Sequence, residues 1–488
     1  MIGGRFRNRA IRIPYYAVPR PCETEIPPDA SRLAEWCIVH GEQMEKMGIF
    51  AGSTLSNNCY LCTNSYSKMK TIPNHNAKIF TDNIEELALE QIQRLLSVKV
   101  FADCKIRIMP DVHAGAGCVI GFTGNLGDKV IPNIVGVDIG CGILVQPLEV
   151  PESIDFHALN NFILKAIPSG RDFRSDQYLP LPHKYMEVYS EAKAIIRELY
   201  CYRLLKESKR LDKSIGSLGG GNHFIELDRD EQGKWYLVIH TGSRNLGKQV
   251  ADLYQKEARK LLSGWDKVME QQKRIIEEYK SQGRRKEIQA VIAKLHSDFK
   301  MQTPPVPPDL CYLEGEPRNE YLHDMRLCQR WARLNRRLIA DLITDFLEEK
   351  HSACGVADGA FESVHNYISD DNLIRKGAIS AKAGERCIIP LNMRDGSLIC
   401  IGKGNADWNC SAPHGAGRAM SRAKAFKELR MEDFKSSMEG IYSETVTNDT
   451  LDEAPMAYKP KDEILANIQD TVSVENIIKP VFNFKAAE

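Results

Sequence analysis

Short apolar runs that end in glycine-rich turns recur along this chain of 488 residues. One such region covers residues 77–147. A second covers 218–246, where the run Trp235-Tyr-Leu-Val-Ile-His240 lies between two glycine clusters. Apolar runs of this length that are bounded by glycine are typical of β-strands joined by tight turns. The pattern therefore predicts β-sheets whose strands end in polar turns.

Segments with helical periodicity separate these strand-rich regions. Residues 84–96 form an amphipathic stretch, and residues 155–210 have helical character. Residues 250–299 are rich in Lys, Glu, Gln and Arg, which predicts a charged helical hairpin or insertion near 255–300 with its charges in solvent. The later features, in chain order, are a proline-rich break at 304–308, a helix over 320–349 and a β-rich segment over 378–401. Periodicity alone therefore predicts an α+β fold.

Composition excludes several classes of protein. The 65 Lys and Arg balance the 65 Asp and Glu, so no net positive field exists to hold a polyanion passively. No apolar run approaches the roughly 18 to 20 residues that span a bilayer, so we expect no membrane segment. The 14 Cys are scattered through the chain, which favours a reducing compartment over a disulfide scaffold. Residues 1–20 lack the apolar core of a secretory signal, and together these features predict a cytoplasmic protein.

Residues 1–75 differ in composition from the rest, with frequent Pro, Asn and Ser, and we interpret them as an N-terminal appendage to a domain over 76–488. The appendage contains two pairs of potential metal ligands, Cys37 with His40 and Cys59 with Cys62. Pairs at this spacing are compatible with a small zinc knuckle. In a chain with many Cys, such pairs also arise by chance.

The residues suited to chemistry lie in the glycine-rich turns. Asp138 and Cys141 are three residues apart, and the intervening glycine can adopt positive φ, so the two side chains can converge. The triple glycine at 219–221 precedes Asn222, His223 and Glu226, and its backbone N–H groups could approach a phosphate. Three further histidines lie at the ends of apolar runs or in such turns: His240, His365 and His414.

Taken singly, each of these residues is more often a satisfied structural group than a ligand. Together, one carboxylate, one thiol and several imidazoles would form a mixed oxygen, sulfur and nitrogen site for a divalent transition metal. The thiol favours zinc by ligand preference, and the set is also compatible with manganese.

Six short motifs of the chain follow one another in the order found in a known protein family. They read Met109-Pro-Asp-Val-His113, Val135-Gly-Val-Asp138-Ile-Gly-Cys141-Gly, Gly221-Asn-His-Phe-Ile-Glu226, His240-Thr-Gly-Ser-Arg244, His365-Asn-Tyr367 and Ser411-Ala-Pro-His414-Gly-Ala-Gly-Arg418. In this form and order the chain resembles the RtcB-type RNA-splicing ligases over about residues 77–485. The resemblance implies mixed β-sheets flanked by helices, with a metal-containing central cleft.

The resemblance also implies an activity. Family members are GTP-dependent ligases that use two Mn²⁺ ions to join an RNA 3′-phosphate or 2′,3′-cyclic phosphate to a 5′-hydroxyl, in tRNA splicing or RNA repair. His414 would be the nucleophile that carries GMP, with Asp111, as general base, and Asn222 beside it. The implied metal ligands are Asp138, Cys141, His223, His240 and His365. The implied nucleotide contacts are Asn222, Glu226, His365, Asn366, Pro390, Met393, Ser397, His414, Gly415, Ala416, Gly417, Tyr458 and Lys485.

One motif departs from the family. Where the family commonly has Pro-Gly-Ser-Met-Gly, this chain has Pro390-Leu-Asn-Met-Arg394. The larger side chains of Leu391 and Arg394 lack the freedom of glycine, so we expect an altered pocket and an altered preference for guanine. Two other functions use the same residues: a metal-dependent cyclic phosphoesterase, and a non-catalytic RNA-binding scaffold. An accessory activating protein is a further expected partner.

Overall fold

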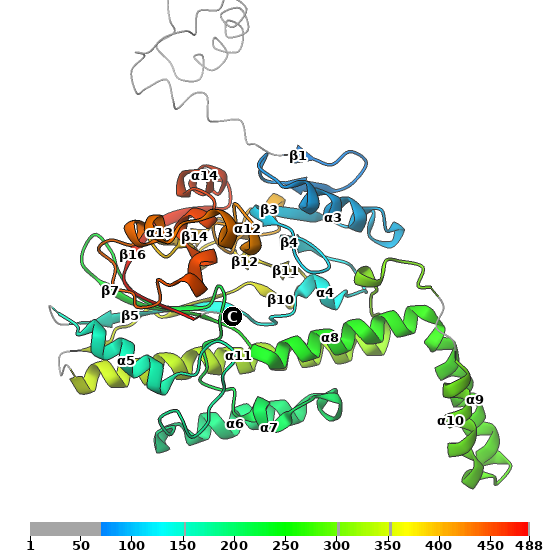
Figure 1. Cartoon of the computed structure of the whole chain (residues 1–488). Coiled ribbons are helices and arrows are strands. Elements are labelled where there is room, and N and C mark those ends of the chain that lie inside the picture. Colours follow the sequence, from blue (N-terminus) through cyan, green and yellow to red (C-terminus); the bar gives the residue numbers. More distant parts are fainter. Residues whose placement is uncertain (1–69, 151–152, 300–302, 351–353, 487–488) are drawn as a thin grey trace, which may run out of the picture. The chain divides into compact units, whose positions relative to one another are not determined.

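The computed structural model describes residues 70–150, 153–299, 303–350 and 354–486 (Figure 1). The two ligand pairs between Cys37 and Cys62 lie outside the described residues. The described chain contains mixed sheets and many helices, which confirms the predicted α+β class. Among these residues, no helix combines the length and the apolarity needed to cross a bilayer.

A six-stranded sheet joins two regions that are far apart in the sequence. Strand β4 pairs antiparallel with both β3 and β11, so residues near 110 and residues near 370 lie in one sheet. This pairing brings the turn after β3 close to the end of β10 and β11. The strands, in sheet order, are β1 (Lys70–Thr71), β2 (Ala77–Ile79), β3 (Ile106–His113), β4 (Ile120–Gly124), β11 (Ile374–Lys376) and β10 (Asn366–Ile368).

An eight-stranded antiparallel sheet carries most of the glycine-turn motifs. Its central strands β6, β7 and β5 are almost wholly buried, and their apolar residues pack into two core clusters, one on each face. The strands, in sheet order, are β13 (Arg386–Asn392), β14 (Gly396–Gly402), β16 (Val472–Lys485), β6 (Phe224–Arg229), β7 (Trp235–Thr241), β5 (Gly142–Glu149) and β8 (Gly355–Val356), with β9 (Phe361–Val364) also paired to β5. A separate pair consists of β12 (Ala378–Ser380) and β15 (Ser411–Pro413).

The helices follow the predicted pattern with two differences. The amphipathic stretch at 84–96 forms α3. The helix expected over 320–349 begins earlier, at Gly315. The prediction missed the first turn of this helix because that turn is polar and carries no apolar periodicity. The expected helical region 155–210 is interrupted by a loop that contains Pro168, Pro180 and Pro182. The helices are α3 (Glu86–Leu96), α4 (Pro132–Val135), α5 (Phe156–Ala166), α6 (Met186–Glu198), α7 (Ser208–Asp212), α8 (Arg244–Lys260), α9 (Asp266–Ser281), α10 (Ile288–Asp298), α11 (Gly315–Lys350), α12 (Arg422–Glu428), α13 (Met431–Ser437) and α14 (Lys461–Asn467).

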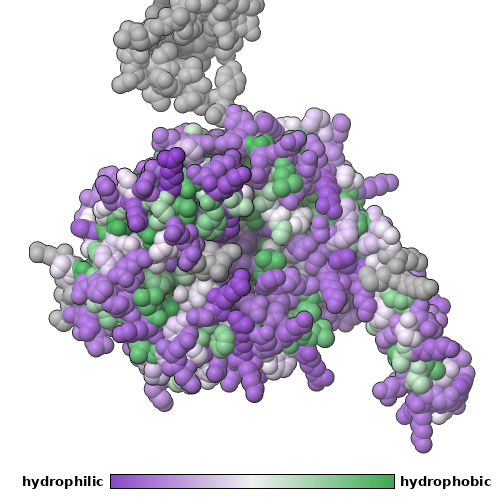
Figure 2. Space-filling model, viewed as in Figure 1, coloured by the Kyte–Doolittle hydropathy of each residue, from purple (hydrophilic) through white to green (hydrophobic). Residues whose placement is uncertain are grey.

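Helices α9 and α10 form a hairpin that projects from the body of the molecule (Figure 1). A π-helical turn, Leu261–Trp265, joins α8 to α9, and Gly264 within it has φ of 97°. Helix α10 buries none of its residues, and the hairpin surface is mostly hydrophilic (Figure 2). The helical character and solvent-facing charge expected for this segment are therefore observed. Its status as an insertion remains a prediction.

Helix α11 supports the turns that carry the candidate ligands. Two neighbouring polar residues of this helix, Asn335 and Arg336, are fully buried. Asn335 accepts hydrogen bonds from the backbone N–H groups of Gly216 and Ser217, at 2.8 and 3.1 Å. Arg336 donates to the carbonyls of Gly140 and Thr241, at 2.9 and 3.0 Å. One helical turn therefore fixes the backbone of three separate loops.

The buried guanidinium of Arg336 gives a test of this support. Its Nε also lies 3.3 Å from Glu362 Oε1, so Arg336→Met would remove the only buried guanidinium that contacts this carboxylate in the described part of the chain, and the donor to two carbonyls. We expect a loss of about 3–5 kcal/mol in the free energy of unfolding, measured by urea denaturation. Arg333 on the same helix lies 3.6 Å from the same carboxylate, but its side chain is 77% exposed. Arg333→Met should therefore cost less than about 1 kcal/mol, and equal losses in the two variants would refute this account.

Candidate active site

Side chains from the glycine turns converge on one buried point. Cys141 Sγ lies 3.3 Å from His223 Nε2 and 3.3 Å from His240 Nε2. His240 Nε2 lies 3.0 Å from His365 Nε2, and His223 Nε2 lies 3.0 Å from Asp138 Oδ2. The prediction that these distant residues meet in space is confirmed. The ligand atoms of Cys141, His223 and His240 all lie within 4.8 Å of one another, and such a mixed sulfur and nitrogen set can hold a divalent transition metal.

Backbone carbonyls orient two of these imidazoles. His223 Nδ1 lies 2.9 Å from the carbonyl of Leu218, and His240 Nδ1 lies 3.0 Å from the carbonyl of Asn222. A carbonyl only accepts, so each Nδ1 carries the proton. Each Nε2 therefore directs a lone pair into the cluster. The facing oxygen of Asp138 is also an acceptor, so the gap between it and His223 Nε2 requires a proton or a metal ion. The residues thus fit a bound cation.

Burial sets the protonation of the cluster. It lowers the pKa of His240 and of His365 well below the ordinary range, and their imidazole neighbours add to this effect. Both rings are therefore neutral near neutral pH, as metal ligands must be. Burial also raises the pKa of the Cys141 thiol well above its usual range. The thiolate form thus needs a metal ion to stabilise it, and metal binding would release this proton.

Two glycines are required by close packing around the cluster. Gly219 has φ of 98°, and a Cβ there would overlap the guanidinium of Arg244. A Cβ at Gly242 would overlap the carboxylate of Asp138. The glycine turns therefore do more than reverse the chain, because they leave the space that the candidate ligand Asp138 and its neighbour Arg244 occupy.

His414 lies beside the cluster with its own orienting group. Its ring centroid is 4.8 Å from that of His365. His414 Nδ1 donates to Asp111 Oδ2 at 2.6 Å, and the His414 backbone N–H donates to the same oxygen at 3.0 Å. The proton on Nδ1 leaves Nε2 with a free lone pair. Asp111 is fully buried, so these contacts favour a role in orienting His414 over the general-base role suggested by the resemblance.

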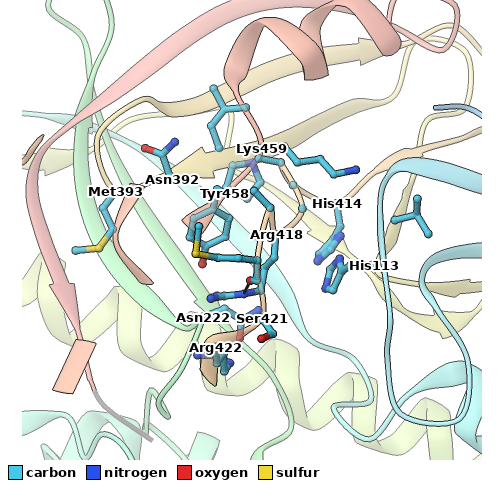
Figure 3. Close-up of a pocket in the computed structure, with 18 of the residues that line it drawn as sticks. His113, Asn222, Asn392, Met393, His414, Arg418, Ser421, Arg422, Tyr458 and Lys459 are labelled. Carbon is cyan, nitrogen blue, oxygen red and sulfur yellow. Dashed lines mark hydrogen bonds between the residues drawn. The ribbon is translucent and has the colours of Figure 1, made fainter. Parts of the chain in front are cut away.

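A cavity of about 550 Å³ opens next to His414, a size suited to a nucleotide. His414 and His113 lie next to each other on one wall (Figure 3). Most of the predicted nucleotide contacts line this cavity: Asn222, Glu226, Pro390, Met393, Ser397, Gly415, Ala416, Gly417, Tyr458 and Lys485. Residues that sequence reasoning did not assign to the site also line it, among them Asn83, Glu85, Asn392, Arg422 and Lys459.

Two of the predicted nucleotide contacts, His365 and Asn366, are absent from the cavity lining, and Asn366 lies instead beside the Asp138 turn. Its amide nitrogen donates to the carbonyl of Asp138 at 3.2 Å, and its amide oxygen accepts from the N–H of Gly377 at 2.9 Å. The side chain therefore ties the end of β10 to the Asp138 turn. These contacts favour a role in positioning a candidate metal ligand.

The altered family turn forms the loop between β13 and β14. Asn392 Oδ1 accepts from the backbone N–H groups of Arg394 and Asp395, at 3.0 and 2.9 Å, which closes the turn without the glycines of the family motif. The guanidinium of Arg394 pairs with the carboxylate of Asp395 at 2.9 Å. The cavity is instead lined by Leu391, Asn392 and Met393. Of the two larger side chains expected to alter the pocket, Leu391 therefore lines the cavity and Arg394 does not, while Asn392 lines it in addition.

The thiol of Cys141 gives a test of the metal site. Cys141→Ala removes one of the converging ligand atoms, so the affinity for divalent metal should fall by at least about 10-fold. Equilibrium dialysis against Mn²⁺, and separately against Zn²⁺, followed by elemental analysis, would measure it. Cys400 is also fully buried but packs in a core cluster that does not include Cys141, so Cys400→Ala is the matched control and should bind as the wild type does. An unchanged metal content in Cys141→Ala would remove this residue from the ligand set.

Comparison with known proteins places the chain in a family. The family model described as "tRNA-splicing ligase RtcB" matches residues 91–486. The chain is 30% identical to the RNA-splicing ligase RtcB of Escherichia coli strain K12 over 439 residues, which covers 85% of this chain and 98% of the relative. It is 26% identical to the tRNA-splicing ligase RtcB of Archaeoglobus fulgidus, with 78% and 87% covered, and 25% identical to that of Aeropyrum pernix, with 76% and 85% covered. The chain therefore belongs to the RtcB family of RNA ligases.

Proposed function

We propose that this chain joins RNA 3′-phosphate or 2′,3′-cyclic phosphate ends to 5′-hydroxyl ends through a guanylylated His414. The observation that carries the proposal is the state of His414. Its Nδ1 proton is held by Asp111, and its ring lies 4.8 Å from that of the candidate ligand His365 and lines a cavity of nucleotide size. A neutral imidazole with a free Nε2 is a competent nucleophile toward phosphorus. We place this activity in the domain over 76–488.

The proposed reaction proceeds in three displacements. His414 Nε2 attacks the α-phosphorus of GTP, so an N–P bond forms and pyrophosphate leaves. An oxygen of the RNA 3′-phosphate then takes the guanylyl group from His414. Finally the RNA 5′-hydroxyl attacks the activated 3′-phosphate, and GMP leaves. A cyclic end is first opened by water to the 3′-phosphate.

The residues of the chain supply orientation in each step. Asp111 retains the Nδ1 proton of His414 and stabilises the positive charge that the ring gains when Nε2 bonds to phosphorus. Asp138, Cys141, His223, His240 and His365 would hold two Mn²⁺ ions. When bound, these ions would offset charge on phosphoryl oxygens and lower the pKa of the attacking hydroxyl. Asn222, Tyr458 and Lys485 line the cavity where the nucleotide would lie.

The first test is protein labelling. Wild-type protein incubated with GTP that carries a radiolabelled α-phosphate, and with Mn²⁺, should acquire an acid-labile label, and His414→Ala should acquire none. His323→Ala is the control, because His323 lies on α11 and is absent from the cavity lining. Opening of a cyclic phosphate without any label would favour the phosphoesterase. The absence of both activities in the wild type would favour the scaffold.

The second test concerns the orientation of His414. Asp111→Asn keeps the size of the side chain but removes the charge that holds the proton on Nδ1. We expect the initial labelling rate to fall by up to about 10⁴-fold, the loss seen when the orienting carboxylate of a catalytic His is neutralised. Thermal unfolding would show that the variant is folded. A labelling rate within twofold of the wild type would contradict the assigned role of Asp111.

A further inference from the structure

One buried carboxylate contacts several side chains of the cavity wall. Glu453 is almost fully buried. Its Oε2 lies 2.8 Å from Lys485 Nζ and accepts a hydrogen bond of 2.5 Å from the Tyr458 hydroxyl. Its Oε1 lies 2.7 Å from a guanidinium nitrogen of Arg422 and 3.3 Å from one of Arg418. All four of these partners line the cavity.

The neighbours of Glu453 keep it ionised. Although burial opposes its charge, Lys485 and Arg422 hold the pKa of Glu453 at about 2. The adjacent Asp452 pairs with Arg422, and its backbone carbonyl accepts from Arg418 at 2.7 Å. The carboxylates of Asp452 and Glu453 thus face the cationic groups of Arg418, Arg422 and Lys485. The carboxylate of Glu453 therefore cancels much of the field that the three cations would direct into the cavity.

The partners of Glu453 differ from those of a carboxylate that serves only the fold. Asp324 is equally buried, and it accepts from the backbone N–H groups of Tyr200 and Cys201, at 2.9 and 3.1 Å, and from the Tyr254 hydroxyl at 2.8 Å. These contacts fix the backbone at residues 200–201. Each contact of Glu453 described above is with a side chain of the cavity wall.

We infer that Glu453 is a positioning residue, which holds Lys485, Tyr458, Arg418 and Arg422 in one arrangement for nucleotidyl transfer and limits how tightly they bind the triphosphate. This inference rests on the proposed function. With the carboxylate in place, the cations meet the nucleotide from fixed directions. Without its charge, they would repel one another, move apart and follow the phosphates of the bound substrate. Binding would then be strong but poorly oriented for transfer.

The test is Glu453→Gln, in which size is preserved and one negative charge is lost. In the GTP self-labelling reaction, KM should stay equal to the wild type or fall, while kcat should fall on the order of 10²-fold, because poorly oriented substrate reacts slowly. Glu453→Asp keeps the charge and shortens the reach. It should therefore keep the wild-type KM and lose less of kcat. Asp324→Asn is the matched control, and it should lower the unfolding temperature without separating kcat from KM.

A second measurement keeps this inference apart from the proposed reaction. Binding of inorganic tripolyphosphate, measured by calorimetry on the intact protein, needs no chemistry at His414. It should tighten by several-fold in Glu453→Gln, because the cavity gains one net positive charge, and stay unchanged in Asp324→Asn. If the wild type takes no label, and Glu453→Gln still binds tripolyphosphate more tightly than the wild type does, only the proposed function would be refuted. Unchanged tripolyphosphate affinity in Glu453→Gln, or KM and kcat within twofold of the wild type, would overturn the role of Glu453.

Discussion

The structure depends on a set of lone pairs that point at one another. The Nδ1 protons of His223 and His240 are used by backbone carbonyls, so their Nε2 atoms face Cys141 and Asp138 as acceptors. The Asp138 carboxylate opposite His223 Nε2 also accepts, so this contact is unfavourable until a proton or a cation enters it. The scaffold must therefore hold these two acceptors together. Buried groups of α11 do so by fixing the backbone of the turns, which is why this long helix carries polar residues in its buried face.

A hydrogen bond from Nδ1 orients each of three imidazoles, but the acceptor of that bond differs among them. A neutral carbonyl holds Nδ1 of His223 and of His240, whereas the carboxylate of Asp111 holds Nδ1 of His414. Either partner selects the tautomer. Only the carboxylate also stabilises a positive charge on the ring, and that charge develops when Nε2 bonds to phosphorus but not in a ring that merely donates its lone pair to a metal ion. The choice of partner thus separates the proposed nucleophile from the candidate ligands.

The sequence predicted the strand-rich regions, the amphipathic helix α3 and the meeting of the candidate ligands, because each leaves a local signal in periodicity or in a motif. It did not predict Asn335, Arg336 or Glu453. Asn335 and Glu453 lie in ordinary polar stretches, and Arg336 contacts a carbonyl 196 residues away. Arg394 shows the opposite error. Its bulk suggested an altered pocket, yet Arg394 pairs with Asp395 and is absent from the cavity lining, and only the folded turn adds Asn392 to that lining beside the expected Leu391.

The charge of the chain is balanced overall but uneven locally. Composition alone shows no positive field, whereas the cavity wall gathers Arg418, Arg422 and Lys485 around buried carboxylates. In a low-dielectric cavity, one uncompensated charge acts more strongly than several on a solvated surface. A site that must take up a polyanion and then let a product go gains from such partial compensation, because affinity for the ground state does not speed the chemical step. The neutral composition of this ligase is thus compatible with anionic substrates, since the balance that matters is the one inside the cavity.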